Sequence, residues 1–200
     1  MKADVLTLDE ATHAYRLGAV ILPSVTQVIG TVLQDWSAYP QEVLARKREL
    51  GTLVHEATSL DSAGELDEDS VDEEVRPYLE AWRRFMREAQ PRIVTTECIV
   101  HHPIYRYAGT LDNEIILNGK RGILDKKTGE LDAFVGLQLA AYQEAVDYNR
   151  KYGESKRALA RWAIRLRPDA TYRLESYVGK NDFTVFLAAL TIYNWRLKHA

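Results

Sequence analysis

The chain has 200 residues, of which 46% are hydrophobic and 28% are charged. This length and composition are typical of one globular domain with a sizeable core. Its single cysteine, Cys98, excludes an internal disulfide framework and any zinc or iron–sulfur site made from four cysteines of one chain. The N-terminus carries no apolar signal-type segment, and no stretch approaches about 18 apolar residues, so we expect a cytoplasmic protein without a membrane span.

Charge is distributed unevenly along the chain. The net charge is -3, yet residues 119–200 carry 15 Lys and Arg against 9 Asp and Glu. Much of the acidity lies in the run 65–74, which we interpret as a solvated loop that enters a helix. The C-terminal half is therefore the part that a polyanion would approach.

The first 90 residues are predicted to be mainly helical, after two short β-type segments at 5–8 and 13–17. Ser24 is expected to begin a helix as its N-cap, and Gln27 to complete a capping box. Two further helices are predicted, over 41–59 and 71–89; the second has apolar residues at a spacing of three and four and ends before Pro91.

From residue 91 onward the apolar pattern changes from a helical to a strand-like period. Strands are predicted over 93–101, 106–117 and 121–127, then a helix over 134–151, strands over 158–167 and 171–178, and a closing helix over 182–198. This order predicts one domain over 1–200, of the α/β class, with a mixed central sheet in 91–200 flanked by helices.

An Asn-Gly pair at 118–119 separates two of the predicted strands. This pair favours a two-residue type I′ hairpin turn, because both central residues of that turn need positive φ. Leu117 then pairs with Lys120, and the same register places Asp112 directly opposite Asp125. The hairpin is therefore predicted to bring two carboxylates face to face.

Such a pair of acids requires a cation. Directly opposed Cβ atoms lie roughly 4.5–5.5 Å apart, where like charges destabilise a sheet. A hard divalent ion such as Mg²⁺, which takes oxygen ligands, meets that need. Lys127 shares a face with Asp125, so its ammonium would position a nucleophile and stabilise a charged transition state. The alternative for an isolated Asp-X-Lys is an ion pair on an exposed strand.

Four motifs follow one another along the chain: Gly51-Thr-Leu-Val-His55-Glu56, Tyr107-Ala-Gly109-Thr-Leu-Asp112, Ile123-Leu-Asp125-Lys-Lys127-Thr-Gly129 and Gln138-Leu-Ala-Ala-Tyr142. Together they resemble the nuclease core of the RecB-like branch of the PD-(D/E)XK superfamily. The segment Leu22-Pro-Ser-Val-Thr26 is also similar to phage exonuclease-like proteins and the mitochondrial genome maintenance exonuclease. The resemblance implies a restriction-endonuclease-like fold and metal-dependent hydrolysis of DNA.

The resemblance also implies a role for each matched position. His55 would be a metal ligand on a helix, and Asp112 and Asp125 would be the metal-binding acids, with the backbone carbonyl of Lys126 in the same shell. Lys127 would be the catalytic lysine.

Three other polar positions have alternatives that stay open. Gln138 and Tyr142 lie four residues apart on one helix face, where they would hold the substrate phosphate or the lysine, or form a structural pair. Glu97, on the strand before the hairpin, is a candidate ligand of a second ion, although a structural role is favoured.

Arginines alternate with apolar residues along 157–167, and Arg161 and Arg165 are the two that we assign to substrate binding. A row of arginines could follow a nucleic-acid backbone. The alternative is that they protect an exposed edge strand against pairing. The pattern does not distinguish these two interpretations.

The function expected from the sequence is that of a deoxyribonuclease that uses Mg²⁺ or Mn²⁺ and acts on DNA, including single strands. The resemblance favours exonuclease action on DNA ends, and no iron–sulfur cluster is expected. An endonuclease of the same fold and a non-catalytic nucleic-acid-binding module are the alternatives. Roles in repair, recombination and phage replication all remain open.

Overall fold

A small antiparallel sheet and a larger mixed sheet organise the computed structural model, which describes residues 5–9, 11–35, 37, 39–149 and 159–199. The small sheet contains β1 (Leu6–Asp9), β2 (Ala14–Leu17) and β3 (Val20–Leu22) in that order. The larger sheet has the order β4-β5-β6-β7-β8, with β4 (Arg92–His102), β5 (Tyr107–Leu117), β6 (Lys120–Lys127), β7 (Ala160–Leu166) and β8 (Tyr172–Ser176). Neighbouring strands of this sheet are antiparallel except β6 and β7, which are parallel.

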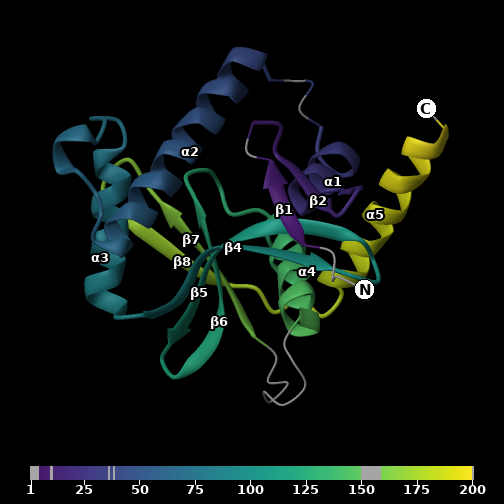
Figure 1. The fold of residues 1–200 in the computed structure, drawn as a ribbon. Coiled ribbons are helices and arrows are strands. Elements are labelled where there is room, and N and C mark those ends of the chain that lie inside the picture. The colour runs from purple at the N-terminus through teal and green to yellow at the C-terminus, as the bar shows by residue number, and fades with distance from the viewer. Residues whose placement is uncertain (1–4, 10, 36, 38, 150–158, 200) are drawn as a thin grey trace.

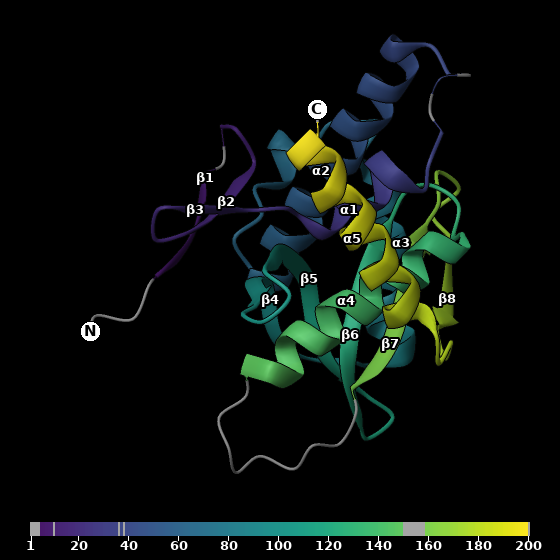
Figure 2. The same cartoon turned by 90° about the vertical axis from the view of Figure 1, so that its right-hand side faces the viewer.

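Helices cover both faces of the larger sheet (Figures 1 and 2). The helices α2 (Gln41–Ala63) and α3 (Arg76–Ala89), with a short 3-10 turn at Glu68–Ser70 between them, lie on one side. The helices α1 (Val25–Val32), α4 (Ala133–Asn149) and α5 (Asp182–His199) lie on the other. The predicted mixed sheet flanked by helices is therefore confirmed.

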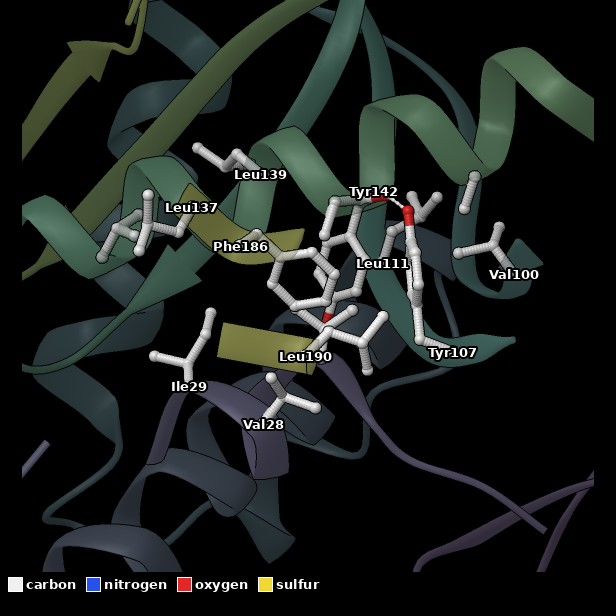
Figure 3. Close-up of a cluster of buried hydrophobic side chains, with 14 of the residues drawn as sticks. Val28, Ile29, Val100, Tyr107, Leu111, Leu137, Leu139, Tyr142, Phe186 and Leu190 are labelled. Atoms are coloured by element: carbon white, nitrogen blue, oxygen red, sulfur yellow. Dashed lines mark hydrogen bonds between the residues drawn. The ribbon is translucent and has the colours of Figure 1, made fainter. Parts of the chain in front are cut away.

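Each side of the sheet has its own apolar core. On the α2–α3 side, Trp82 and Phe85 are fully buried against strand residues such as Ile164. On the other side, Phe186 and Leu139 pack with a larger group of side chains from α1, α4, α5 and the sheet (Figure 3). The second core fixes α4 on the sheet, and α4 carries two of the predicted site residues.

Local sequence signals set where most helices begin and end. Ser24 caps α1, and Gln27 completes the capping box as predicted. The helix α2 runs past the predicted end at 59 and stops at Gly64, which adopts the left-handed conformation with φ 72°. The helix α3 begins at Arg76 rather than at 71, because Pro77 lies in its first turn, where a missing N–H costs nothing.

The N-terminal part contains more β-structure than the sequence predicted. The strand Val20–Leu22 was not predicted, because three residues are too few to show an alternating pattern. It completes the small sheet, whose Tyr15 and Leu22 pack against Ala108 of β5. The predicted ends of two elements, at 150–151 and 158, lie outside the described residues.

The predicted hairpin is present in the predicted register. Asn118 has φ 50° and Gly119 has φ 74°, as a type I′ turn requires. Pairing runs from Leu117 with Lys120 to Asn113 with Leu124.

Among the helices that the structure describes, none combines the length and the apolar composition of a membrane-spanning segment.

Candidate active site

A cavity of about 1100 Å³ lies between the main sheet, α2 and the N-terminal part of the chain. All four side chains that the sequence assigned to metal binding or catalysis line it, namely His55, Asp112, Asp125 and Lys127, and so do Glu97, Gln138 and Tyr142. Its other walls are mostly neutral and polar, and include Thr12, His13, Thr26, Gln27, Arg48 and Thr52. The cavity thus brings together residues from α2, β5, β6 and α4.

Asp112 and Asp125 both open into this cavity, so the two carboxylates lie on one side of the hairpin as predicted. The hydrogen-bonded ladder ends one pair earlier, at Asn113 and Leu124. Instead of a simple opposed pair, Asp112 Oδ2 accepts a hydrogen bond of 2.6 Å from the backbone N–H of Lys126. This bond holds Asp112 against β6, where both acids are buried.

His55, on α2, lies beside Asp112 of the acidic pair. Its Nδ1 lies 3.4 Å from Asp112 Oδ1, and its Nε2 lies 2.9 Å from the backbone carbonyl oxygen of Lys126. If Nε2 donates to that carbonyl, a neutral ring presents the lone pair of Nδ1 to a carboxylate. This contact is favourable only when a proton or a metal ion lies between the two atoms.

Glu97 joins the same group of ligand-type atoms. One atom from each of His55, Glu97 and Asp112 lies within 4.8 Å of the others. Glu97 has φ 49° in the middle of β4, a left-handed conformation that costs a non-glycine residue roughly 1–2 kcal/mol. Backbone strain of this kind clusters at functional sites, and Glu97 lines the cavity together with His55 and Asp112. No local sequence signal marks this conformation.

Gln138 links Lys127 to Asp125. Its Nε2 donates to Asp125 Oδ1 at 2.8 Å, and its Oε1 accepts from Lys127 Nζ at 3.1 Å. The ammonium of Lys127 also lies 2.7 Å from Asp125 Oδ2. Tyr142, one turn further along α4, has its hydroxyl 3.5 Å from Gln138 Nε2. The predicted site role of Gln138 and Tyr142 thus has a geometric basis, because both contact the Asp-X-Lys motif or its partner.

The two aspartates differ in their electrostatic surroundings. Burial alone raises the pKa of both carboxyl groups. At Asp112 the charge and hydrogen bond of His55, followed by the charges of Lys126 and Lys127, outweigh burial and lower the pKa. At Asp125 burial prevails over Lys127, and the nearby charge of Asp112 raises the pKa further. Two adjacent acids with divergent pKa values are characteristic of catalytic sites.

Arg161 and Arg165 lie outside the lining of the cavity. Arg161 pairs with Asp182 at 2.9 Å and donates to the carbonyl oxygen of Gly179, and Arg165 pairs with Glu130. The exposed-edge alternative is wrong, because β7 pairs with β6 on one side and β8 on the other. Ion pairs that hold β7 against neighbouring segments are the roles that this geometry favours.

Neither the family models nor the curated proteins with which the chain was compared give a match. These comparisons therefore do not identify a family for the chain. The fold itself brings residues from the motifs at 51–56, 107–112, 123–129 and 138–142 to one cavity. The chemistry assigned to the site rests on its own residues and geometry.

Proposed function

We propose that the protein is a metal-dependent deoxyribonuclease with a PD-(D/E)XK core. The observation that carries this proposal is the convergence of Asp112, Asp125 and Lys127 with His55 on one cavity. Two buried acids on adjacent strands repel each other and destabilise a protein unless a bound cation neutralises their charge. A lysine beside them can stabilise the negative charge that develops when a phosphodiester is hydrolysed.

The donor atoms fit a hard divalent ion. Carboxylate oxygens with one imidazole are ligands that Mg²⁺ and Mn²⁺ accept. Asp125 Oδ2 is buried and its cationic neighbour is the ammonium of Lys127 at 2.7 Å, which leaves a second lone pair of that oxygen for an ion. We assign His55 Nδ1, Asp112 and Asp125 to this ion, with Glu97 beside them. The carbonyl of Lys126, expected from the sequence to be a ligand, instead accepts from His55 Nε2 on the far side of the ring and orients the imidazole. A bound ion supplies Lewis-acid stabilisation of phosphate charge and lowers the pKa of water.

Lys127 is held in place and still reaches the cavity. Its side chain is 27% exposed, and Asp125 and Gln138 fix its ammonium. Burial alone would lower the pKa of Lys127, but Asp125 and Asp112 raise it, so the group stays charged at neutral pH. A fixed ammonium can orient the attacking water and stabilise the negative charge that develops on the phosphate. Tyr142, whose pKa burial raises well above its ordinary value, stays a neutral hydroxyl beside Gln138.

The remaining cavity wall supports an extended polar substrate. Thr12, Thr26, Gln27 and Thr52 offer neutral hydrogen-bonding groups, and Arg48 adds one positive charge. Such groups make sequence-independent contacts with sugar and phosphate. Exonuclease action on ends is the more specific part of the proposal, and an endonuclease with the same residues is the second candidate.

Digestion of DNA by the purified chain tests the proposal. A labelled single-stranded oligonucleotide and a supercoiled plasmid are incubated with Mg²⁺, with Mn²⁺ and with EDTA. We expect the oligonucleotide to be shortened from an end only with a divalent ion, and the plasmid to stay intact. Nicking of the plasmid would replace the exonuclease assignment by the endonuclease. Intact DNA under every condition, or equal digestion in EDTA, would contradict the nuclease assignment itself.

A further inference from the structure

Lys126 is a buried lysine that the proposed hydrolysis does not use directly. It is only 1% exposed, and its side chain leaves β6 on the opposite face from that of Lys127. Its ammonium donates to Thr58 Oγ1 at 2.9 Å and to Ser59 Oγ at 3.1 Å, and lies 5.5 Å from the centre of a Trp82 ring. Burying a charge is costly unless partners compensate it, so these contacts indicate a specific role.

A chain of hydrogen bonds leads from this ammonium to Glu97. The hydroxyl of Ser59 donates to Glu97 Oε1 at 3.1 Å and accepts from Lys126. Because an ammonium can only donate, it leaves the single hydroxyl hydrogen of Ser59 to point at the carboxylate. Lys126 Nζ itself is 4.0 Å from Glu97 Oε1, so charge attraction acts in the same direction.

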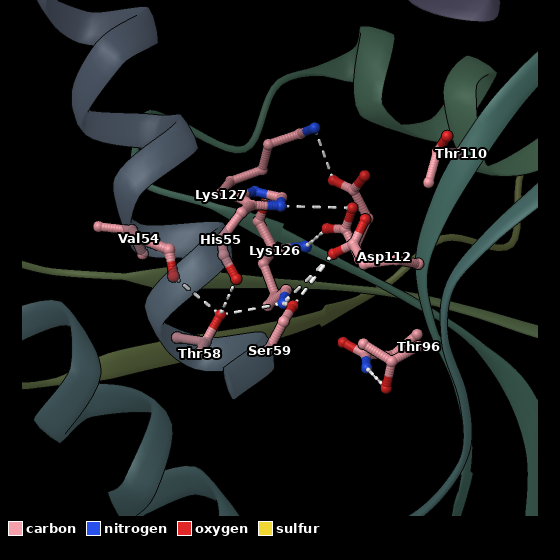
Figure 4. A network of polar contacts seen from close by, with 12 residues as sticks. Val54, His55, Thr58, Ser59, Thr96, Thr110, Asp112, Lys126 and Lys127 are labelled. Atoms are coloured by element: carbon pink, nitrogen blue, oxygen red, sulfur yellow. Dashed lines mark hydrogen bonds and ion pairs between the residues drawn. The ribbon is translucent and has the colours of Figure 1, made fainter. Parts of the chain in front are cut away.

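The same ammonium also fastens the helix that carries His55. Thr58 and Ser59 follow His55 by one turn of α2, and the Thr58 hydroxyl donates back to the backbone carbonyls of Val54 and His55 (Figure 4). Lys126 therefore ties α2 to β6 and, through Ser59, to β4. Two of these elements, α2 and β4, supply His55 and Glu97 of the candidate cluster, and β6 holds its third member, Asp112 of β5, through the backbone N–H of Lys126.

We propose that Lys126 and Ser59 are positioning residues that hold Glu97 in the ligand cluster. This inference rests on the proposed function, because it requires a divalent ion at that cluster. Charge repulsion alone gives the opposite expectation, because a nearby ammonium repels a cation. If the ammonium acted by charge alone, its removal would tighten ion binding; if it acts by positioning, its removal weakens binding.

Calorimetric titration of the full chain with Mn²⁺ separates these two effects. Lys126→Met removes the charge and keeps the volume, and Ser59→Ala removes the link to Glu97. Lys120→Met is the matched control, at the exposed start of the same strand. We expect about tenfold weaker Mn²⁺ binding for each of the first two variants, the usual effect of losing a partner of a metal ligand, and wild-type binding for the control.

Measuring Lys126→Met in a Glu97→Gln protein shows whether Lys126 affects Mn²⁺ binding through Glu97. In that background, Lys126→Met is expected to weaken Mn²⁺ binding by much less than about tenfold, because the carboxylate that it positions is gone and only its contacts with α2 remain. The proposal is overturned if Lys126→Met and Ser59→Ala bind Mn²⁺ as tightly as wild type or more tightly. It is equally overturned if Lys126→Met costs the same in both backgrounds, or if the wild type does not bind Mn²⁺.

Failure of the positioning role is distinguishable from failure of the nuclease assignment. A wild type that binds Mn²⁺ with the expected losses in the variants, but cuts no DNA, would refute the nuclease and leave the positioning role standing. A wild type that cuts DNA, with unchanged Mn²⁺ affinity in both variants, would do the reverse. If Lys126→Met does not fold, Ser59→Ala decides the matter alone, since it keeps the buried ammonium and its Thr58 contact.

Discussion

The imidazole of His55 and the carboxylate of Asp112 approach to 3.4 Å, Nδ1 to Oδ1, from a helix and a strand that are far apart in the sequence. Asp112, assisted by Asp125, raises the pKa of His55, although burial alone would lower it. A proton on the ring and a metal ion therefore compete for the same place between nitrogen and oxygen. The stabilisation that involves His55 should therefore change with pH in opposite directions in the absence and in the presence of the metal ion.

Without metal, His55 should stabilise the fold more at low pH than at high pH. Its pKa is raised above the ordinary value of about 6.5, so its stabilisation is fully present below that value and is lost as pH rises through the raised pKa. Urea unfolding in EDTA, compared between wild type and His55→Gln, should show a free-energy difference that shrinks from pH 5.5 to pH 8.5. A difference that grows with pH would contradict the His55–Asp112 pair.

With metal, the dependence should reverse. Mn²⁺ binds the neutral ring, so the rise in melting temperature that Mn²⁺ produces should grow as pH increases through the raised pKa of His55. In His55→Gln this part of the pH dependence should be absent. Identical Mn²⁺ stabilisation of the two proteins at every pH would remove His55 from the ion's ligands.

Gln138 should matter for hydrolysis because it fixes the positions of both Asp125 and Lys127. Gln138→Leu removes both hydrogen bonds and leaves the charges in place. We expect the single-turnover rate of oligonucleotide cleavage to fall about ten- to a hundredfold, as for other outer partners of a metal site. Gln41→Leu, at the exposed start of α2, is the control. An unchanged rate in Gln138→Leu would assign Gln138 a purely structural role.

Gly109 should tolerate no side chain, because its neighbour across the core is Tyr142. A Cβ at this position would lie 2.5 Å from the Tyr142 ring, whereas one at Gly129 would meet nothing within 4 Å. We expect Gly109→Ala to lower the free energy of unfolding by about 1–3 kcal/mol, and Gly129→Ala to change it little. Most of that loss should disappear in a Tyr142→Leu background. Equal stability of the two alanine variants in urea would refute the close contact.

Signals between near neighbours in the sequence predicted much of this structure. The Asn-Gly pair at 118–119 fixed the turn, and the turn fixed which residues of β5 and β6 pair. Ser24 and Gln27 predicted the start of α1 for the same reason, since a capping box lies within four residues. That register places Asp112 and Asp125 on one side of the hairpin, where both line the cavity.

The remaining features depend on contacts between distant segments. The left-handed backbone of Glu97 has no local sequence signature, because glutamate rarely adopts it. Lys126 resembles any strand lysine until α2 supplies its buried partners. The arginine row suggested a nucleic-acid surface, but Asp182, which pairs with Arg161, belongs to a helix that begins 21 residues further along. Only the folded chain shows these pairings.

The rate of DNA cleavage by Lys127→Ala tests the central claim most directly. Wild type, Lys127→Ala and the exposed-lysine control Lys120→Ala are compared under single-turnover conditions with saturating Mn²⁺, and calorimetry confirms that each binds the ion. The account predicts a roughly 10²–10³-fold slower reaction for Lys127→Ala, with Mn²⁺ binding retained and the control at the wild-type rate. Cleavage by Lys127→Ala at the wild-type rate would contradict it.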